Sequence, residues 1–118
     1  EKFLDVFRKA LAFYLSRLPE DLVPCWDMIF APESGEPRDS SSAAIVACGL
    51  LEAAKYVGAD EAEQWRTLAR QMLGSLARNY TVKPGTLGSG QLLHGTYSKP
   101  PRAWMNARAG AITSTWRR

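Results

Sequence analysis

The amino-acid sequence predicts an all-α fold of antiparallel helical pairs. Two long segments repeat apolar residues at the i, i+3, i+4, i+7 spacing of a helix with one buried side. A third segment between them is apolar nearly all round, and connections rich in proline and glycine separate the segments. The sequence lacks the alternation of apolar and polar residues that would indicate a β-sheet. Together these observations favour helices that pack directly on one another.

The first expected helix spans residues 2–18 and has one apolar side. Pro19 ends this helix, because the residue before a proline avoids the helical region. A proline-rich connection follows up to residue 38, in which Trp26 and Phe30 are expected to anchor the chain to the core. The apolar side of the helix consists of Phe3, Val6, Phe7, Ala10, Leu11, Tyr14, Leu15 and Leu18.

The stretch PRDSSSAAIVACGLLE, residues 37–52, leads into the second expected helix, residues 40–57. A serine nucleophile would need a histidine base within hydrogen-bond reach, and His94 is the only histidine in the chain. A helix cap needs only an Asp or Ser side chain that accepts the first free backbone N–H groups. We therefore favour Asp39 or Ser40 as a helix cap over a reactive serine.

The second helix is expected to be buried nearly all round, including the residues from Ile45 to Leu51. Cys48 within it fits a small buried residue. The third helix is expected over residues 61–80, after a cap by Asp60. Its apolar side consists of Trp65, Leu68, Ala69, Met72, Leu73, Leu76 and Tyr80.

Residues 81–100 are rich in glycine and proline and are expected to form a loop. His94 lies in this loop, followed by the hydroxyl side chains of Thr96, Tyr97 and Ser98. Two interpretations stay open. The histidine is either hydrogen-bonded where the loop packs down, or it contacts a ligand. In the second case the neighbouring hydroxyl groups suit a polyhydroxylated or anionic ligand.

Composition narrows the function classes. The 118 residues carry a formal net charge of +3 and are 46% hydrophobic, which is typical of one globular domain or part of one. Charges of both signs are mixed before residue 100, so nucleic-acid binding is not expected. No apolar run is long enough to span a membrane, and no metal-binding cluster stands out. Cys25 and Cys48 do not make a disulfide framework, so we expect a reducing, cytoplasmic compartment.

Three segments together resemble one family, the unsaturated glucuronyl hydrolases of glycoside hydrolase family 88. The first, VPCWDM, is similar to the family's Pro-Tyr-Trp-Asp-Phe segment. The second, PRDSSSAAIVACGLLE, is similar to its Pro-Arg-Asp-Ser-Ser-Ala-x-Ala-Ile-x-Ala-x-Gly-Leu-Leu-Glu helix. The third, LLHGTYSKP, is similar to its Leu-Leu-His-x-Thr-Tyr segment. They follow in the family's order, and the resemblance covers residues 1 to about 106.

The resemblance implies a fold and an activity. Residues 1–118 would form a single partial domain, the C-terminal part of an (α/α)6 barrel. Enzymes of the family act on oligosaccharides that polysaccharide lyases release, and they hydrate the double bond of the terminal unsaturated uronic acid. They use no metal and no organic cofactor, so none is expected here. The implied partner is an unsaturated oligosaccharide.

The resemblance also implies which residues contact the substrate. Only the loop with His94, Thr96, Tyr97 and Ser98 matches a part of the family near the substrate site. The family's two catalytic aspartates come from segments upstream of anything in this chain, so no catalytic residue is expected and the chain alone is expected to be inactive or nearly so. The alternative is a non-catalytic helical module that binds carbohydrate or another partner. A partial barrel exposes helix faces, from which we expect self-association.

The tail over residues 107–118 departs from the family. The family continues with a segment like Trp-Gly-Asp-Tyr-Phe-x-Leu-Glu-Ala, whereas residues 109–118 are AGAITSTWRR. Codons can be chosen for these residues so that a shifted reading frame encodes the family segment. We therefore hypothesise a slip of the reading frame near residues 106–109. The nucleotide sequence of the gene decides the question, because a shifted frame that does not encode the segment excludes the slip.

Overall fold

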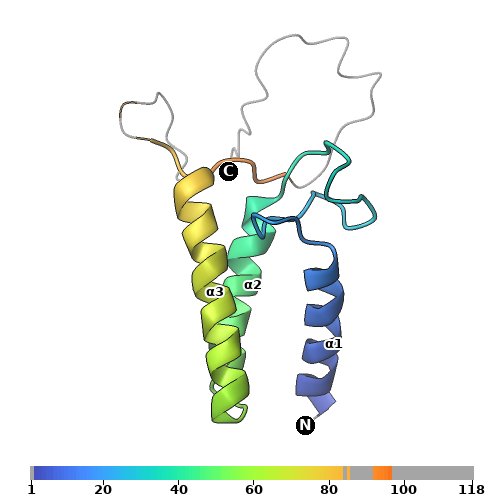
Figure 1. Ribbon diagram of the computed structural model, residues 1–118, viewed down its shortest axis with the longest axis vertical. Coiled ribbons are helices and arrows are strands. Elements are labelled where there is room, and N and C mark those ends of the chain that lie inside the picture. Colours follow the sequence, from blue (N-terminus) through green and yellow to red (C-terminus); the bar gives the residue numbers. More distant parts are fainter. Residues whose placement is uncertain (1, 84, 86–91, 97–118) are drawn as a thin grey trace, which may run out of the picture.

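Three helices form the part of the chain that the computed structural model describes, which is residues 2–83, 85 and 92–96. The helices are α1 (Lys2–Ser16), α2 (Ser40–Ala53) and α3 (Ala59–Asn79). Successive helices run in opposite directions (Figure 1). The long connection after α1 and the chain that leaves α3 lie at one end of the molecule, and the short turn between α2 and α3 lies at the other.

The helical arrangement confirms the predicted all-α fold. Within the described residues there is no strand, only two isolated antiparallel bridges, which join Cys25 to Arg38 and Thr81 to Leu92. None of the helices described is long and apolar enough to cross a membrane. The hypothesised frame slip concerns residues 107–118, which lie outside the described residues.

Helix ends differ from the predictions where tight turns or glycine intervene. Helix α1 ends at Ser16 and α2 at Ala53, both earlier than predicted, because the residues that follow them form turns with i to i+3 backbone hydrogen bonds. Helix α3 begins at Ala59, and its N-cap is Gly58, which has no side chain to cap with. Asp60 was predicted as the cap and lies instead inside the first turn, where its charge favours the positive helix end.

Helix α1 packs against α3 near the end of the molecule with the short turn. The ring of Phe7 meets the indole of Trp65 edge-on, with centroids 5.2 Å apart. Beside this contact the guanidinium of Arg8 donates to both carboxylate oxygens of Glu61, at 2.7 and 2.9 Å. This hydrogen-bonded ion pair raises the pKa of Arg8 and lowers the pKa of Glu61. The two contacts fix the angle at which α1 lies on the helical pair.

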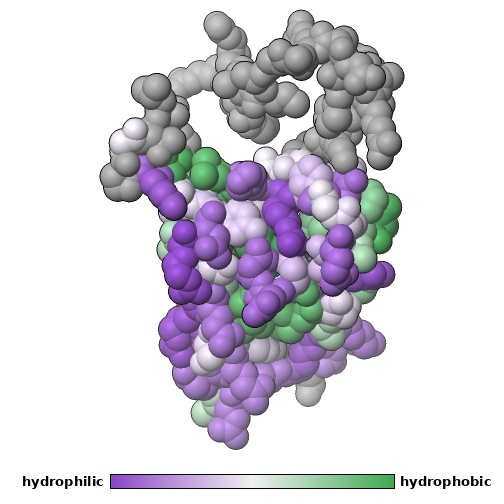
Figure 2. Space-filling view, turned by 45° about the horizontal axis from the view of Figure 1, so that its top comes forward, coloured by the Kyte–Doolittle hydropathy of each residue, from purple (hydrophilic) through white to green (hydrophobic). Residues whose placement is uncertain are grey.

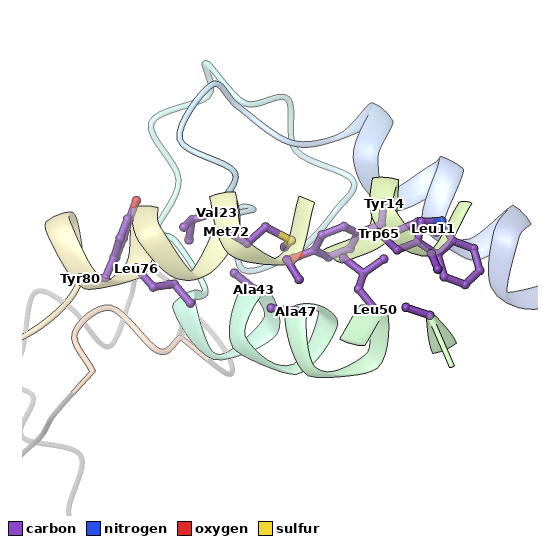
Figure 3. Packing of buried hydrophobic residues seen from close by; sticks show 13 residues of the cluster. Leu11, Tyr14, Val23, Ala43, Ala47, Leu50, Trp65, Met72, Leu76 and Tyr80 are labelled. Carbon is purple, nitrogen blue, oxygen red and sulfur yellow. The ribbon is translucent and has the colours of Figure 1, made fainter. Parts of the chain in front are cut away.

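A single buried cluster joins the three helices and the first connection (Figure 3). Ala43, Ala47 and Leu50, at i, i+4 and i+7, form the buried side of α2. The small side chains of Ala43 and Ala47 let α3 approach closely, where it contributes Met72 and Leu76 among other residues. The α2–α3 pair is therefore the centre of the core.

Val23 anchors the long connection to this core, since its side chain is fully buried and its carbonyl accepts a hydrogen bond from Arg38 at 2.9 Å. Trp26 and Phe30 were predicted as the anchors. They are only half-buried and pack on each other, with ring centroids 5.9 Å apart. The indole of Trp26 also donates to Glu36 at 3.1 Å. These two aromatic rings stabilise the connection itself rather than its attachment to the core.

The prediction that α2 is buried nearly all round is wrong. Ile45 is 71% exposed, Leu51 is 40% exposed, and Cys48 is also exposed. The described helices pack against the opposite side of α2 and leave this side uncovered. Figure 2 shows hydrophobic residues gathered within a mostly hydrophilic face of the molecule. Large apolar side chains on this side of α2 are therefore exposed among the described residues.

Candidate functional site

The segment 92–96 folds back from α3 onto the start of α2. Leu93 donates its backbone N–H to the carbonyl of Tyr80 at 2.6 Å, next to the bridge between residues 81 and 92. Ser40, the first residue of α2, is fully buried and donates its hydroxyl to the carbonyl of Leu93 at 2.5 Å. The backbone N–H of Ser40 donates to the carbonyl of His94 at 3.1 Å. The loop is thus attached to both α2 and the end of α3.

Asp39 is the N-cap of α2. It is one of the two residues predicted for this role. Its Oδ1 accepts the backbone N–H of Ser41 at 3.1 Å and also the hydroxyl of Ser41. Ser40 was the other predicted cap, and its side chain instead binds the loop at Leu93. The hydroxyl of Ser42 donates to Tyr14. Each of the three serine hydroxyls thus has a partner other than histidine, which supports the cap over the reactive serine.

His94 has an unusual backbone conformation for a residue with a side chain. Its φ angle is +61°, in the left-handed region that non-glycine residues rarely adopt. This bend turns the carbonyl of His94 toward Ser40 and leaves the residue exposed. The imidazole meets the ring of Tyr80 at 88°, with centroids 5.9 Å apart. One side of the imidazole therefore contacts protein, while the residue as a whole remains accessible to a ligand.

Tyr80 connects the loop to the first connection. Its hydroxyl donates to Oδ2 of Asp21 at 2.6 Å, and Oδ1 of Asp21 accepts the backbone N–H of Val23 at 3.2 Å. Burial, followed by the hydrogen bond to Asp21, raises the pKa of Tyr80 to about 12. The phenol is therefore a protonated donor at neutral pH. Sequence reasoning assigned Tyr80 to the apolar side of a helix and did not connect it with Asp21.

Of the four residues predicted to contact the substrate, the structure describes His94 and Thr96. Tyr97 and Ser98 lie outside the described residues. A Cβ on Gly95 would lie 4.0 Å from the Cβ of Ser41, so the loop runs directly beside the start of α2. A carboxylate, hydroxyl groups and an imidazole consequently gather at this end of the molecule. Such groups donate to and accept from sugar hydroxyls.

The same end of the molecule has a polar groove of about 910 Å³. It is formed by residues 20–22 and by α3 between Thr67 and Asn79, and not by the loop with His94. Its lining mixes both charge signs, with Glu20 and Asp21 on one side and arginines of α3 on the other. Among the residues described, no three His, Cys, Asp or Glu side chains gather as metal ligands.

Curated relatives cover most of this sequence. The chain is 38% identical over 100 residues to the unsaturated chondroitin disaccharide hydrolase of Streptococcus pneumoniae, a match that covers 83% of this chain and 25% of the relative. It is 32% identical over 96 residues to the unsaturated glucuronyl hydrolase of a Bacillus species, over 80% of this chain and 26% of the relative. No family model matches the sequence.

Solved structures agree with the sequence relatives. The unsaturated glucuronyl hydrolase from Streptococcus agalactiae superposes with a TM-score of 0.73 at 38% identity, over 80% of this chain and 26% of that chain. The chain belongs to the unsaturated glucuronyl hydrolase family. It spans about a quarter of the length of the family members that it matches. The fold of these hydrolases is an α/α barrel, and the three helices are part of one.

Some of the similar solved structures of this family are named with a ligand. A mutant of the Streptococcus agalactiae enzyme is complexed with dGlcA-GalNAc6S, and this structure superposes with a TM-score of 0.66 over 81% of this chain.

Proposed function

We propose that this chain is the C-terminal part of an unsaturated glucuronyl hydrolase and supplies a sugar-binding loop to its active site. The proposed contacts are His94, Thr96, Tyr97 and Ser98. The observation that carries the proposal is the attachment of the loop to the start of α2 by two hydrogen bonds from Ser40, one to the carbonyl of Leu93 and one to that of His94, beside an exposed imidazole. The family membership supports it, since the chain matches about a quarter of the length of a curated family member.

The proposed reaction of the whole enzyme is hydration of the double bond of a terminal unsaturated uronic acid. The catalytic aspartates come from the rest of the enzyme, outside this chain. The loop contributes imidazole and hydroxyl groups, which form hydrogen bonds with the hydroxyl and carboxylate groups of the sugar. No metal and no organic cofactor takes part. The 118-residue chain alone is therefore expected to bind the sugar without converting it.

The test uses the pure chain and an unsaturated chondroitin disaccharide. Turnover removes the absorbance of the double bond, so a constant absorbance is expected even at high protein concentration. Binding is followed in every variant by NMR shifts of the disaccharide, and in chains that retain the imidazole of His94, the only histidine, also by its shifts. His94→Ala is expected to weaken binding, and Lys55→Ala at the far end is the control. Turnover by the chain alone would contradict the assignment of catalysis to the rest of the enzyme, and equal binding by His94→Ala would contradict the role of the loop.

We further propose that two copies of the chain associate through an apolar groove between α1 and α2. The groove has a volume of about 260 Å³. Ile45 lines the groove and is 71% exposed, and Phe3, one helical turn before the lining residue Phe7, is 91% exposed. A second copy offers the same two apolar helices, so a two-fold contact would cover both grooves at once. The lining residues are Phe7, Ala10, Leu11, Tyr14, Ile45, Val46 and Gly49.

We also propose a cytoplasmic location. Cys25 and Cys48 are both free thiols, and Cys48 is exposed. Free thiols persist in reducing compartments, whereas an exposed thiol in an oxidising compartment is prone to oxidation. The proposal is supported by these thiols alone.

A further inference from the structure

We infer that Asp21 and Tyr80 are positioning residues that hold the imidazole of His94 in the orientation in which it receives the sugar. This inference rests on the proposed function of the loop. The three side chains come from three separate segments of the chain, and contacts connect them in a row. Asp21 accepts the hydroxyl of Tyr80 at 2.6 Å, and the ring of Tyr80 meets the imidazole edge-on.

The first member of the row is itself held in place. Oδ1 of Asp21 accepts the N–H of Val23, whose side chain is fully buried in the core. Leu22 between them has a φ angle of +61°, a left-handed conformation that costs free energy for a leucine. This bend lets the carboxylate of Asp21 bind the backbone two residues ahead while its other oxygen accepts from Tyr80.

The second member contacts the loop twice. The carbonyl of Tyr80 accepts the N–H of Leu93. The ring of Tyr80 packs against the imidazole of His94, which follows Leu93. Because the hydroxyl of Tyr80 is held by Asp21, the far end of the ring has a defined position where the ring meets His94. His94 is the second residue in this network with a φ of +61°. Strained backbone of this kind concentrates at binding sites, where the surrounding contacts maintain it.

The consequence concerns affinity. An exposed histidine without a neighbour would sample several rotamers, and binding would have to order it. Contact with Tyr80 orders the imidazole before the sugar arrives. Removal of the hydroxyl of Tyr80 leaves the ring but releases it from Asp21. We therefore expect a loss of affinity of about threefold to tenfold, which corresponds to the ordering of one side chain.

The experiment compares Tyr80→Phe with Tyr56→Phe in the full 118-residue chain. Both substitutions remove one phenol–carboxylate hydrogen bond, since Tyr56 donates to Glu52 at 3.0 Å at the other end of α2. The dissociation constant of the unsaturated chondroitin disaccharide is measured by NMR titration, together with the imidazole signals of His94 without ligand. Tyr80→Phe is expected to weaken binding and to shift the imidazole signals, and Tyr56→Phe is expected to do neither.

A second pair of variants tests the role of Asp21. Asp21→Asn retains an oxygen that accepts from Tyr80, so it is expected to bind better than Asp21→Ala. Asp21→Ala combined with Tyr80→Phe is expected to bind no worse than either single variant, because both break the same contact. If Tyr80→Phe does not fold, the comparison of Asp21→Asn with Asp21→Ala still tests the positioning role: equal binding by these two variants would contradict it.

The outcomes separate this inference from the function on which it rests. Sugar binding that His94→Ala weakens but that Tyr80→Phe and Asp21→Ala leave unchanged overturns the positioning role and keeps the proposed function. A native chain that does not bind the disaccharide overturns the proposed function and, with it, this inference. Additive losses in the double variant also contradict the inference, since they would show two independent effects.

Discussion

At the scale of single residues, Asp39 determines where α2 begins. Its carboxylate accepts the backbone N–H of Ser41, one of the amides that a helix start leaves without an intrahelical partner. Asp39→Ala is expected to lower the free energy of unfolding by about 0.5–2 kcal/mol. Urea denaturation measures this change. Asp39→Asn retains an accepting oxygen and is the matched control, and an equal loss in both variants would contradict capping.

Tyr80 gives a prediction about alkaline pH. Its pKa is raised from 10 in the unfolded chain to about 12 in the folded one. A group with a raised folded-state pKa contributes stability that is complete below the unfolded value and is lost as pH rises through the folded value. Between pH 10 and 12 the free energy of unfolding of the native chain is therefore expected to fall relative to that of Tyr80→Phe.

The measurement is chemical denaturation of both chains at several pH values. Comparison with Tyr80→Phe is needed because burial also raises the pKa of Tyr14, which adds its own pH dependence to both chains. A difference that stays constant from pH 8 to pH 12 would show that the phenol of Tyr80 ionises alike in the folded and unfolded states.

The residues of the cap and of the loop show which single-residue features a sequence can predict. Asp39 was predictable because capping depends on neighbouring residues alone. The hydrogen bond between Asp21 and Tyr80 was not, because its partners are 59 residues apart and no sequence pattern relates one to the other. His94 was located by its resemblance to a family segment, whereas its attachment to Ser40 depends on backbone groups that every residue carries.

At the scale of helices, the two leucines of α2 provide a direct test of its buried side. Leu50 is fully buried and Leu51 is 40% exposed, although they are neighbours of the same type. Leu50→Ala is expected to lower the free energy of unfolding by about 2–5 kcal/mol through lost burial and a cavity. Leu51→Ala is expected to cost less than about 1 kcal/mol. Thermal or urea denaturation checks both, and equal losses would mean that another side of α2 faces the core.

The existence of all three helices followed from the sequence, whereas the buried side of α2 did not. Apolar spacing distinguishes the two sides of α1 and α3. In α2 small and apolar residues occur on every side, so the pattern carries no information about which side faces the core. Ile45, Cys48 and Leu51 were therefore assigned to the interior and are exposed in the structure. A helix inside a barrel has neighbours on several sides, and the described residues include only some of them.

At the scale of the whole molecule, the uncovered side of α2 leads to a prediction about association. Ile45→Glu places a charge on the proposed contact and is expected to shift the chain toward the monomer by at least tenfold in dissociation constant, or about 1.4 kcal/mol. Sedimentation velocity over a range of concentrations measures this shift. Ile29→Glu is the matched control, because Ile29 is 73% exposed and lies in the connection, away from the groove.

Three results would contradict the association. The native chain could sediment as a monomer at high concentration, Ile45→Glu could leave the association unchanged, or Ile29→Glu could weaken it equally. Each result would show that the groove between α1 and α2 is not the contact between copies.

The position of Cys48 has a practical consequence. It lies one helical turn after Ile45, so its thiol is on the same side of α2 as the proposed contact. Cys25 is buried, so a thiol reagent should react with the two cysteines at very different rates. The faster rate reports whether the side of α2 with Ile45 is covered, by a second copy or by the rest of a barrel. The reactivity of Cys48 therefore measures assembly in the native chain, without an engineered cysteine.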